Sequence, residues 1–436
     1  MCPLKESDSQ AIPDTSSIPD TMRALVLDGV GFDRLRIARV PMPQPGPRQM
    51  LARVDAAGIC TSLIKLVEQG PAHHFLYGWD IARYPLILGD EGSITLVQVG
   101  QELRERYQPG QRYVIQPAVD HPPINHLERY RDRSRSIDKI AVGYTLPGHL
   151  AEYILVTEEV LAAKCLLPLP ERSLPYAHTA LAEPFSCVVS AQDHHLHLAQ
   201  SDPGTARQVM KGLKPGGVTV IVGAGAMGRM HVDLALSYHP RAIIVVDLIE
   251  ERLGLVKQLF ARRAETLAVA LHIVNPAITD PQVLLSQVTG GRGADDVIVA
   301  VGSRQAIETA QRYTGRGAVL NLFGGLKSGE DSIGLDSGIV HYQEINVTGS
   351  SGGSPWDVAI TLELMTTGEI DAGKHISRIG DLDHAIEFLE MVKAQRIDGK
   401  AVVYPHRRSD RILAVSSWSA QDERTYLLPV GSGQWA

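Results

Sequence analysis

Two adjacent carboxylates are the residues of this sequence that most need a partner. In the stretch YPLILGDEGSIT (residues 84–95), Asp90 and Glu91 stand between two apolar, strand-like runs, with a glycine on each side. Like charges repel when they are this close, and burial at the mouth of a sheet is costly unless a cation lies beside them. The pattern therefore indicates a nearby cation and leaves its identity open.

Two residues from distant segments offer further ligands for such a cation. Cys60 ends the strand-like run LARVDAAGIC, and Glu183 lies in LAEPFSCVVSA. A thiolate and carboxylates can form a catalytic zinc site that has three protein ligands and an open position. Taken singly, Cys60 is more typical of a buried structural thiol, and Glu183 of a carboxylate at a helix N-terminus.

The most interpretable motif is a glycine-rich turn. Gly223, Gly225 and Gly228 form GxGxxG after the apolar run VTVIV and at the start of a helix-like segment. These glycines permit a tight turn, close approach of a pyrophosphate and close helix–strand packing. Asp247 ends the next predicted strand. Its carboxylate would bind a ribose 2′-hydroxyl and repel a 2′-phosphate, which predicts NAD(H) rather than NADP(H). The other residues predicted around this coenzyme are Ala226, Met227 and Arg252. The alternative is a glycine-rich turn in some other α/β sheet.

Two kinds of element must position these residues. Short β-like runs separated by Gly and Pro predict a β-rich domain over 22–185. From about residue 205, apolar strand-like runs alternate with helix-length segments, which predicts a doubly wound parallel sheet and an α/β fold class. The predicted organisation is a disordered tail (1–21), a catalytic domain (22–185), a coenzyme domain (186–353), a return to the catalytic domain (354–405) and a C-terminal extension (406–436).

Composition excludes several classes of function. The chain has 436 residues with 42 Lys and Arg against 49 Asp and Glu, a formal net charge of −7. This charge disfavours a general nucleic-acid or anionic-membrane surface. No apolar run approaches the roughly 18 to 20 residues that span a bilayer, and the polar N-terminus has no signal-peptide pattern. Four cysteines do not make a disulfide framework. These features predict a cytoplasmic enzyme.

The motifs together resemble the zinc-dependent medium-chain dehydrogenase/reductase superfamily, which includes alcohol, sorbitol and threonine dehydrogenases. The resemblance runs from about Met22 to Pro405. It rests on AGICTS, on LILGDEGS in place of the family's G-H-E-x-x-G, on GHLAEYILV and on LAEPFSCVVSA. Within the superfamily, YQPGQRYVIQ, GYT and VHYQEINVTGSSGGSPWD look most like the sorbose-1-phosphate reductase branch. The resemblance implies a GroES-like β-rich catalytic domain and a Rossmann coenzyme domain.

The resemblance also implies roles for individual residues. The implied ligands of one catalytic zinc are Cys60, Asp90, which stands where the family has histidine, and Glu183. Implied catalytic residues are Glu91 next to the metal, Ser62 on the substrate oxygen, and Lys65 in the place of a relay histidine. Val301 in AVGS and Phe323 in LFGG match segments near the nicotinamide. The family further implies a homodimer or homotetramer that uses the EINVTGS region.

The sequence departs from the family pattern in its metal chemistry. No four-cysteine lobe lies between Tyr113 and Gly143, which predicts no structural zinc. Asp90 in place of histidine makes the shell of Cys60, Asp90, Glu183 and Zn²⁺ sum to −1, so the metal should be a weaker Lewis acid, and Mn²⁺ or Co²⁺ should be better tolerated. Other clusters indicate little without partner residues, or are more typical of a solvated face: His73–His74, His121, His126, His194–His195–His197 and the arginines at 129, 131, 133 and 135.

These features predict a zinc-dependent NAD(H) oxidoreductase. It would interconvert a secondary alcohol (a polyol, sugar alcohol or sugar phosphate) and its ketone. The alternative is a non-catalytic or metal-free NAD-binding homologue, which the presence of Asp90 and Lys65 would favour. A zinc-free quinone-type reductase fits poorly, because Cys60, Asp90 and Glu183 would then have no reason to coincide.

Overall fold

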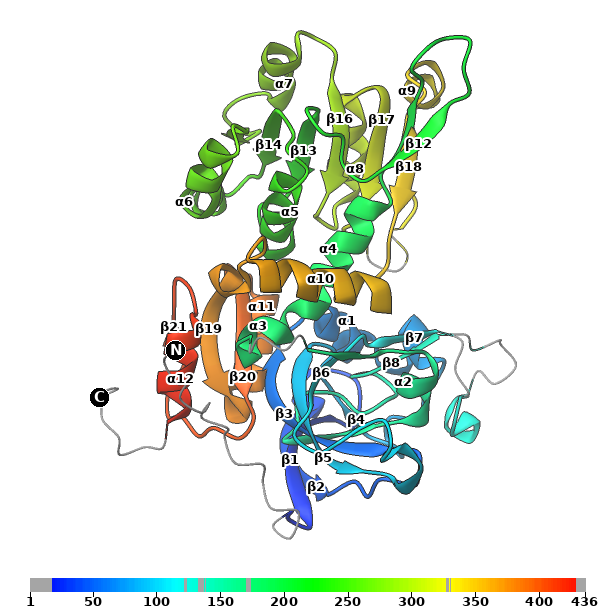
Figure 1. Ribbon diagram of the computed structural model, residues 1–436, viewed down its shortest axis with the longest axis vertical. Helices are drawn as coiled ribbons and strands as arrows, with labels where there is room; N and C mark the ends of the chain where they lie inside the picture. The colour runs from blue at the N-terminus through cyan, green and yellow to red at the C-terminus, as the bar shows by residue number, and fades with distance from the viewer. Residues whose placement is uncertain are drawn as a thin grey trace, which may run out of the picture. The chain divides into compact units, whose positions relative to one another are not determined.

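The computed structural model describes residues 18–120, 124–131, 137, 139–169, 174–326, 329 and 331–428. The chain divides into two compact units (Figure 1). The first combines Met1–Glu183 with Arg378–Ala436, and the second is Pro184–Ser377. Most of the predicted N-terminal tail, together with His121 and the arginines at 133 and 135, lies outside the described residues. Among the described residues, no helix is both long enough and apolar enough to cross a membrane.

The first unit is built on antiparallel sheets. One sheet has the order β10-β6-β5-β3-β20-β19-β21 with β9 on β3, another has the order β2-β1-β4, and β7 pairs with β8. The strands are β1 (Thr21–Leu27), β2 (Leu35–Pro41), β3 (Met50–Gly58), β4 (Leu86–Ile87), β5 (Gly92–Val99), β6 (Arg112–Ile115), β7 (Ala118–Asp120), β8 (Lys139–Ala141), β9 (Tyr153–Val156), β10 (Leu166–Pro168), β19 (Ile376–Asp381), β20 (Lys400–Tyr404) and β21 (Leu413–Ala414). The helices are α1 (Ser62–Gln69), α2 (Glu158–Ala162), α3 (Tyr176–Ala180), α11 (Ala385–Lys393) and α12 (Ala420–Leu427). The predicted β-rich domain is confirmed.

The second unit is a six-stranded parallel sheet with the order β15-β14-β13-β16-β17-β18. Its strands are β13 (Val218–Val222), β14 (Ala242–Val246), β15 (Ala270–Val274), β16 (Ala294–Val299), β17 (Thr314–Leu322) and β18 (Asn346–Gly349), and β11 (Leu196–Ala199) and β12 (Gln208–Lys211) form a separate antiparallel ribbon. The helices are α4 (Ala182–Asp193), which starts at the boundary of the units, α5 (Ala226–Leu236), α6 (Glu250–Thr266), α7 (Pro281–Thr289), α8 (Arg304–Ala310), α9 (Ser337–Tyr342) and α10 (Pro355–Thr367). The predicted parallel sheet is confirmed.

Helices cover both faces of the parallel sheet. In β13, Val220 belongs to the apolar cluster that includes side chains of α7 and α8, whereas Ile221 belongs to the cluster that includes side chains of α5 and α6 (Figure 1). Successive strand residues point to opposite faces, so a strand buried on both faces must be apolar throughout. This requirement explains the uninterrupted run VTVIV.

The boundary between the two units differs from the proposed domain limits in the C-terminal part of the chain. The return to the first domain is predicted at residue 354, whereas α10 belongs to the second unit and the chain re-enters the first unit at Arg378. Residues 354–377 have mixed sequence character, and no signal in them separates a last helix of one unit from the first element of the next.

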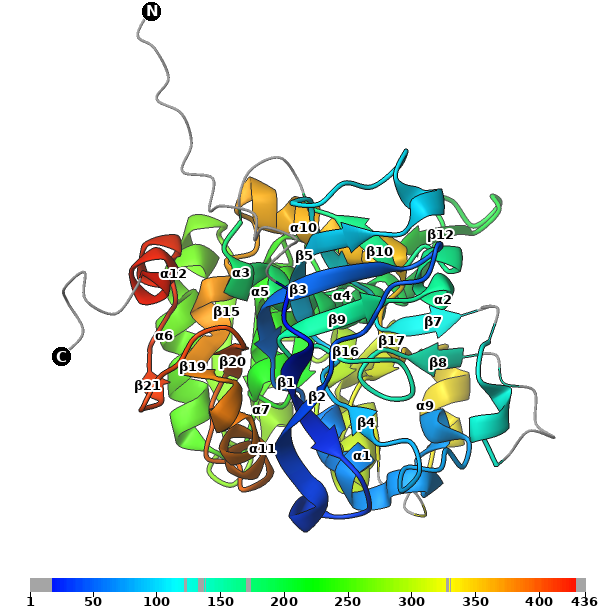
Figure 2. The same ribbon diagram turned by 90° about the horizontal axis from the view of Figure 1, so that it is seen from below.

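The C-terminal extension packs on the first unit. The segments β21 and α12 lie beside β19 and β20 in both views (Figure 1 and Figure 2). The Glu423 carboxylate accepts hydrogen bonds from the backbone N–H groups of Tyr176 and Ala177, at 2.7 and 2.8 Å, and from the Tyr404 hydroxyl at 2.8 Å. Trp418 Nε1 donates to the same hydroxyl at 2.7 Å. The extension therefore holds the start of α3, which leads into α4 and Glu183.

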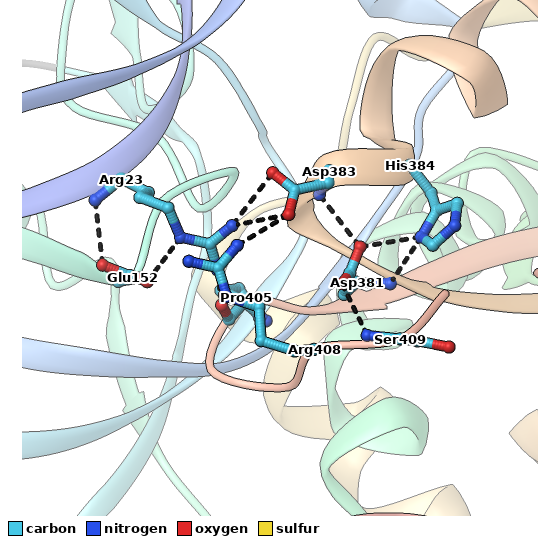
Figure 3. A network of polar contacts seen from close by, with 8 residues as sticks. All are labelled: Arg23, Glu152, Asp381, Asp383, His384, Pro405, Arg408 and Ser409. Carbon is cyan, nitrogen blue, oxygen red and sulfur yellow. Dashed lines mark hydrogen bonds and ion pairs between the residues drawn. The ribbon is translucent and has the colours of Figure 1, made fainter. Parts of the chain in front are cut away.

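A buried arginine joins three distant parts of the first unit (Figure 3). Arg23 on β1 pairs with Glu152 at 2.8 Å and with Asp383 at 3.0 Å, and it donates to the Pro405 carbonyl at 3.0 Å. In the same network, Asp381 accepts hydrogen bonds from the Ser409 backbone N–H and from the His384 ring (Figure 3). These contacts fix the returning C-terminal segment against the N-terminal strand.

We expect Arg23→Leu to lower the free energy of unfolding by about 2–3 kcal/mol, because it leaves the Glu152 carboxylate without its cation, whereas Asp383 keeps Arg408. Arg39→Leu is the matched control, since Arg39 is exposed and lies opposite Arg23 across the β1–β2 pair, and its expected cost is below about 0.5 kcal/mol. Urea unfolding followed by circular dichroism measures both. Equal effects of the two variants would contradict this account of the network.

Candidate active site

Cys60, Asp90 and Glu91 come together at the ends of two paired strands. Cys60 follows β3, and the two carboxylates precede β5. The strands are antiparallel with Ala57 opposite Gly92, so the residue after one strand meets the residues before the other. One ligand atom of each of the three residues lies within 4.8 Å of the others. The structure thus brings these predicted residues together within the first unit.

A glycine makes the close approach possible. A Cβ atom at Gly58 would lie 2.0 Å from Glu91 Oε2, inside any permitted contact distance. The Gly58 N–H also donates to the Glu91 carbonyl at 3.1 Å. Any larger residue at position 58 would therefore push the Glu91 carboxylate out of its place.

Lys400 supplies a positive charge to this site. It forms a buried ion pair with Glu91, in which the lysine side chain is 6% and the glutamate side chain 0% exposed. Because β20 pairs with β3 and places Val402 opposite Gly58, the first residue of β20 reaches the end of β3. Burial acts to lower the pKa of Lys400, but Glu91 and Cys60 outweigh it, and the pKa is raised. Lys400 is absent from the predicted site, because nothing local in the sequence links it to a residue 309 positions away.

Even with Lys400 present, the pKa values of Cys60, Asp90 and Glu91 are all raised. Burial raises the pKa of Cys60 well above its usual value, and Asp90, Glu91 and Glu183 raise it further. Burial also raises the pKa values of Asp90 and Glu91. Burial and mutual repulsion both favour the protonated forms, and a divalent cation at the same point would favour the charged forms.

The donor set fits a divalent cation. Asp90 Oδ1 and Glu91 Oε2 are buried and form no well-aligned hydrogen bond with a described residue, and the Cys60 thiol is the group that approaches both carboxylates. A thiolate and carboxylate oxygens are known zinc ligands. Glu183 lies in the first turn of α4 and acts on both Cys60 and Tyr144, although the 4.8 Å group contains Glu91 in its place. Of the two adjacent carboxylates, Asp90 is a predicted metal ligand, whereas Glu91 is predicted as a catalytic residue next to the metal.

The other oxygen of Asp90 belongs to a hydrogen-bonded chain. The Ser62 hydroxyl donates to Asp90 Oδ2 at 2.7 Å. Ser62 is also hydrogen-bonded to Tyr144, whose pKa is raised well above its usual value by burial and by Asp90 and Cys60. The ring of His73 packs against Tyr144 with 5.4 Å between centroids. Tyr144 is missing from the predicted catalytic residues, although its motif GYT contributes to the resemblance.

Lys65 lies beside two histidines. It acts electrostatically on His73 and His74, and Lys139 acts on His74 as well. The pKa of His73 is lowered to about 4, mainly by burial and then by His74 and Lys65. Lys65 and Ser62 are three residues apart on α1 and therefore share one face of the helix.

The glycine-rich turn in the second unit has the expected geometry. Gly223 has a φ of +105°, and a Cβ atom at Gly228 would lie 1.8 Å from the Gly223 carbonyl oxygen. Asp247 Oδ2 accepts a hydrogen bond from the Ala224 N–H at 2.6 Å, and Oδ1 accepts one from the Ile249 N–H at 2.9 Å. The carboxylate at the end of β14 is thus held against the turn, as in a dinucleotide site.

The surroundings of this turn hold the other predicted coenzyme residues. Ala226 and Met227 open α5 after Gly225, and Arg252 lies in the first turn of α6. Val301 is exposed after β16, and the Phe323 ring after β17 contacts the ring of His231. They follow the carboxyl ends of parallel strands, the edge at which ligands bind in such sheets.

Two family descriptions match the chain. Residues 46–170 match the alcohol dehydrogenase GroES-like domain, and residues 226–367 match the zinc-binding dehydrogenase family. L-sorbose 1-phosphate reductase of Klebsiella pneumoniae is 30% identical over 358 residues, which cover 81% of each chain. Mannitol-1-phosphate 5-dehydrogenase of Aliivibrio fischeri is 28% identical over 381 residues, covering 86% of this chain and 85% of that protein. The chain belongs to the zinc-binding medium-chain dehydrogenase/reductase superfamily, whose members include alcohol and polyol dehydrogenases.

A solved structure has the same fold. A zinc-binding dehydrogenase from Sinorhizobium meliloti 1021, bound to NADP, superposes with a TM-score of 0.67 at 24% identity, covering 89% of this chain and 100% of the other. The expected GroES-like and Rossmann-like architecture is thereby confirmed.

We expect Lys400→Met to destabilise the protein by about 3–5 kcal/mol, because it leaves Glu91 buried without its cation. Lys393→Met is the control: Lys393 pairs with Glu68 at the surface, where both side chains are nearly half exposed, and its loss should cost less than about 1 kcal/mol. In the double variant Glu91→Gln, Lys400→Met, much of the lost stability should return. Thermal unfolding of the four proteins tests this, and no recovery in the double variant would contradict the pairing.

Proposed function

We propose that this protein is a zinc-dependent NAD(H) oxidoreductase that interconverts a secondary alcohol and its ketone. The observation that carries the proposal is the convergence of Cys60, Asp90 and Glu91 around buried oxygens that have no described partner. Cys60, Asp90 and Glu183 would hold the metal. When bound, zinc supplies a Lewis acid for an alcohol oxygen.

The residues around this site have separate tasks in the proposal. Lys400 neutralises Glu91. The charge around the metal is then set by its three proposed ligands, Cys60, Asp90 and Glu183. Ser62 Oγ, held by Asp90, orients the substrate hydroxyl and takes its proton. The proton then leaves by way of the Tyr144 hydroxyl, which is hydrogen-bonded to Ser62. Hydride transfer is the chemistry of the nicotinamide.

A phosphorylated polyol is the substrate class that we favour. The names of the two relatives, L-sorbose 1-phosphate reductase and mannitol-1-phosphate 5-dehydrogenase, support it. Lys65 and Lys139 add support, because both act on His74, whose neighbour His73 packs against Tyr144. Two lysines beside His74 suit a phosphate dianion, which would compete with Asp120, 3.9 Å from Lys139 Nζ. We also propose a homo-oligomer, for which β18, the edge strand of the parallel sheet, offers a pairing surface.

Zinc content and turnover test the proposed function together. We expect Cys60→Ser and Asp90→Asn each to lower the zinc content by about one equivalent per chain and to reduce alcohol oxidation more than about 100-fold. Asp90→His should keep the metal. The measurement is plasma mass spectrometry on untagged protein, with polyols and their phosphates as substrates. Unchanged zinc in both loss variants, with NAD binding intact and no turnover in the wild type, would instead favour the non-catalytic alternative.

Asp247 tests coenzyme choice separately. Asp247→Ser removes a charged acceptor for the ribose 2′-hydroxyl, so kcat/KM for NAD should fall by about 10–100-fold while that for NADP falls less. Glu251→Gln is the control, since it removes one exposed negative charge on α6 outside the glycine-rich turn. Steady-state kinetics with both coenzymes decide the point. An unchanged NAD/NADP ratio would show that Asp247 does not select the coenzyme.

A further inference from the structure

A second cluster of ligand-type side chains lies in the parallel-sheet unit. His195 Nδ1 lies 2.7 Å and His197 Nε2 lies 2.8 Å from the same oxygen, Asp296 Oδ1. All three residues are buried, and Asp296 and His195 are fully so. The histidine run is uninformative in the sequence because its partner stands about a hundred residues further along the chain.

The fold explains why these rings meet the carboxylate. His195 immediately precedes β11 and His197 lies within it, so the two rings project from one face of the β11–β12 ribbon. Leu196 and Leu198 alternate with them and are 46% and 61% exposed. Asp296 lies in β16 of the parallel sheet. The cluster therefore fastens the ribbon to the sheet.

The Asp296 carboxylate is ionised in this setting. Burial alone would raise its pKa, but the hydrogen bonds from His195 and His197 outweigh it and lower the pKa to about 2. Its second oxygen accepts the Lys214 backbone N–H at 2.9 Å. Two ring nitrogens and one backbone N–H thus converge on this single buried carboxylate.

The hydrogen bonds leave several polar atoms around the cluster without partners. His195 Nε2 is buried and unpartnered among the described residues. Thr219, directly opposite Asp296 in the neighbouring strand, has an unpartnered hydroxyl, and so does the amide oxygen of Gln192, whose nitrogen contacts His231. Buried polar atoms of this kind indicate a ligand or water that satisfies them.

We propose that His195, His197 and Asp296 bind a divalent transition metal such as zinc, at a site separate from Cys60. Two imidazoles and a carboxylate are a recurrent donor set for zinc and its neighbours. Bonds of about 2.0–2.2 Å would set the donor atoms roughly 3.0–3.5 Å apart, so the observed spacing needs only a small expansion.

Metal binding also sets the tautomer of His195. With a metal on Nδ1, the ring proton resides on Nε2, and a ligating histidine ordinarily donates this N–H to an acceptor. In this structure Nε2 has no described partner, and neither do Gln192 Oε1 and Thr219 Oγ1, so a buried water would be needed to satisfy the N–H. The role of the site is structural: it fastens the β11–β12 ribbon to β16 of the parallel sheet.

The test is the zinc content of the full, untagged chain in a series of variants. We expect His197→Gln to lose about one zinc equivalent and Cys60→Ser to lose a different one, so the double variant should lose both. His194→Gln is the matched control, because His194 is the exposed neighbour of His195 and should keep the wild-type content. The zinc that remains in the Cys60→Ser protein therefore reports on the His195–His197–Asp296 site, even if the proposed site at Cys60 binds no metal.

Cobalt absorption spectra and melting temperatures test the second site without any need for enzyme activity. In Cys60→Ser protein, bound Co²⁺ should show d–d absorption without a sulfur charge-transfer band, and added zinc should raise the melting temperature. Both effects should vanish in Cys60→Ser, His197→Gln, which circular dichroism must show to be folded. A Cys60→Ser protein that takes up neither zinc nor cobalt would overturn the proposal and leave a purely hydrogen-bonded triad.

Discussion

The buried ion pair between Glu91 and Lys400 is the constraint on which the candidate active site depends. Two adjacent carboxylates and a thiol occupy the ends of β3 and β5, where burial penalises every negative charge. Lys400 pairs with Glu91 and also acts on Asp90 and Cys60, and a metal is the second cation that we propose. The sheet itself performs this division, because β3 is paired with β5 on one side and with β20 on the other. A single central strand thus brings anions and cation to one point.

The two oxygens of Asp90 have different surroundings, so one oxygen is available to a cation and the other is fixed by a hydrogen bond. Oδ2 accepts the Ser62 hydroxyl, which is also bonded to Tyr144. Oδ1 is buried without a described partner. An imidazole in this position would have one nitrogen for a metal and one for a fixed hydrogen bond. An aspartate can do the same with its two oxygens, at the cost of one more negative charge.

The fold and part of the candidate site could be predicted from the sequence, for definite physical reasons. Continuous apolar strands that alternate with helices specify the parallel sheet, and GxGxxG with Asp247 is a local pattern. Cys60, Asp90 and Glu91 are recognisable because their motifs are contiguous. Lys400 and Tyr144 are not, since their roles exist only through strand pairing and packing. The same limit applies to His195 and Asp296, which the fold alone brings together.

The C-terminal extension shows a further limit. No motif marks Glu423 as important, yet its carboxylate holds the backbone at the start of α3. That helix leads into the segment that carries Glu183. The structure therefore connects a terminus of unassigned character to the neighbourhood of the proposed metal ligands by two hydrogen bonds from backbone amides.

Anomalous diffraction at the zinc edge, from crystals of untagged protein with measured activity, tests the central claim most directly. The account predicts a peak about 2.0–2.3 Å from Cys60 Sγ and from an Asp90 carboxylate oxygen, with Glu91 still paired to Lys400. An active protein without a peak between Cys60 and Asp90 would contradict it.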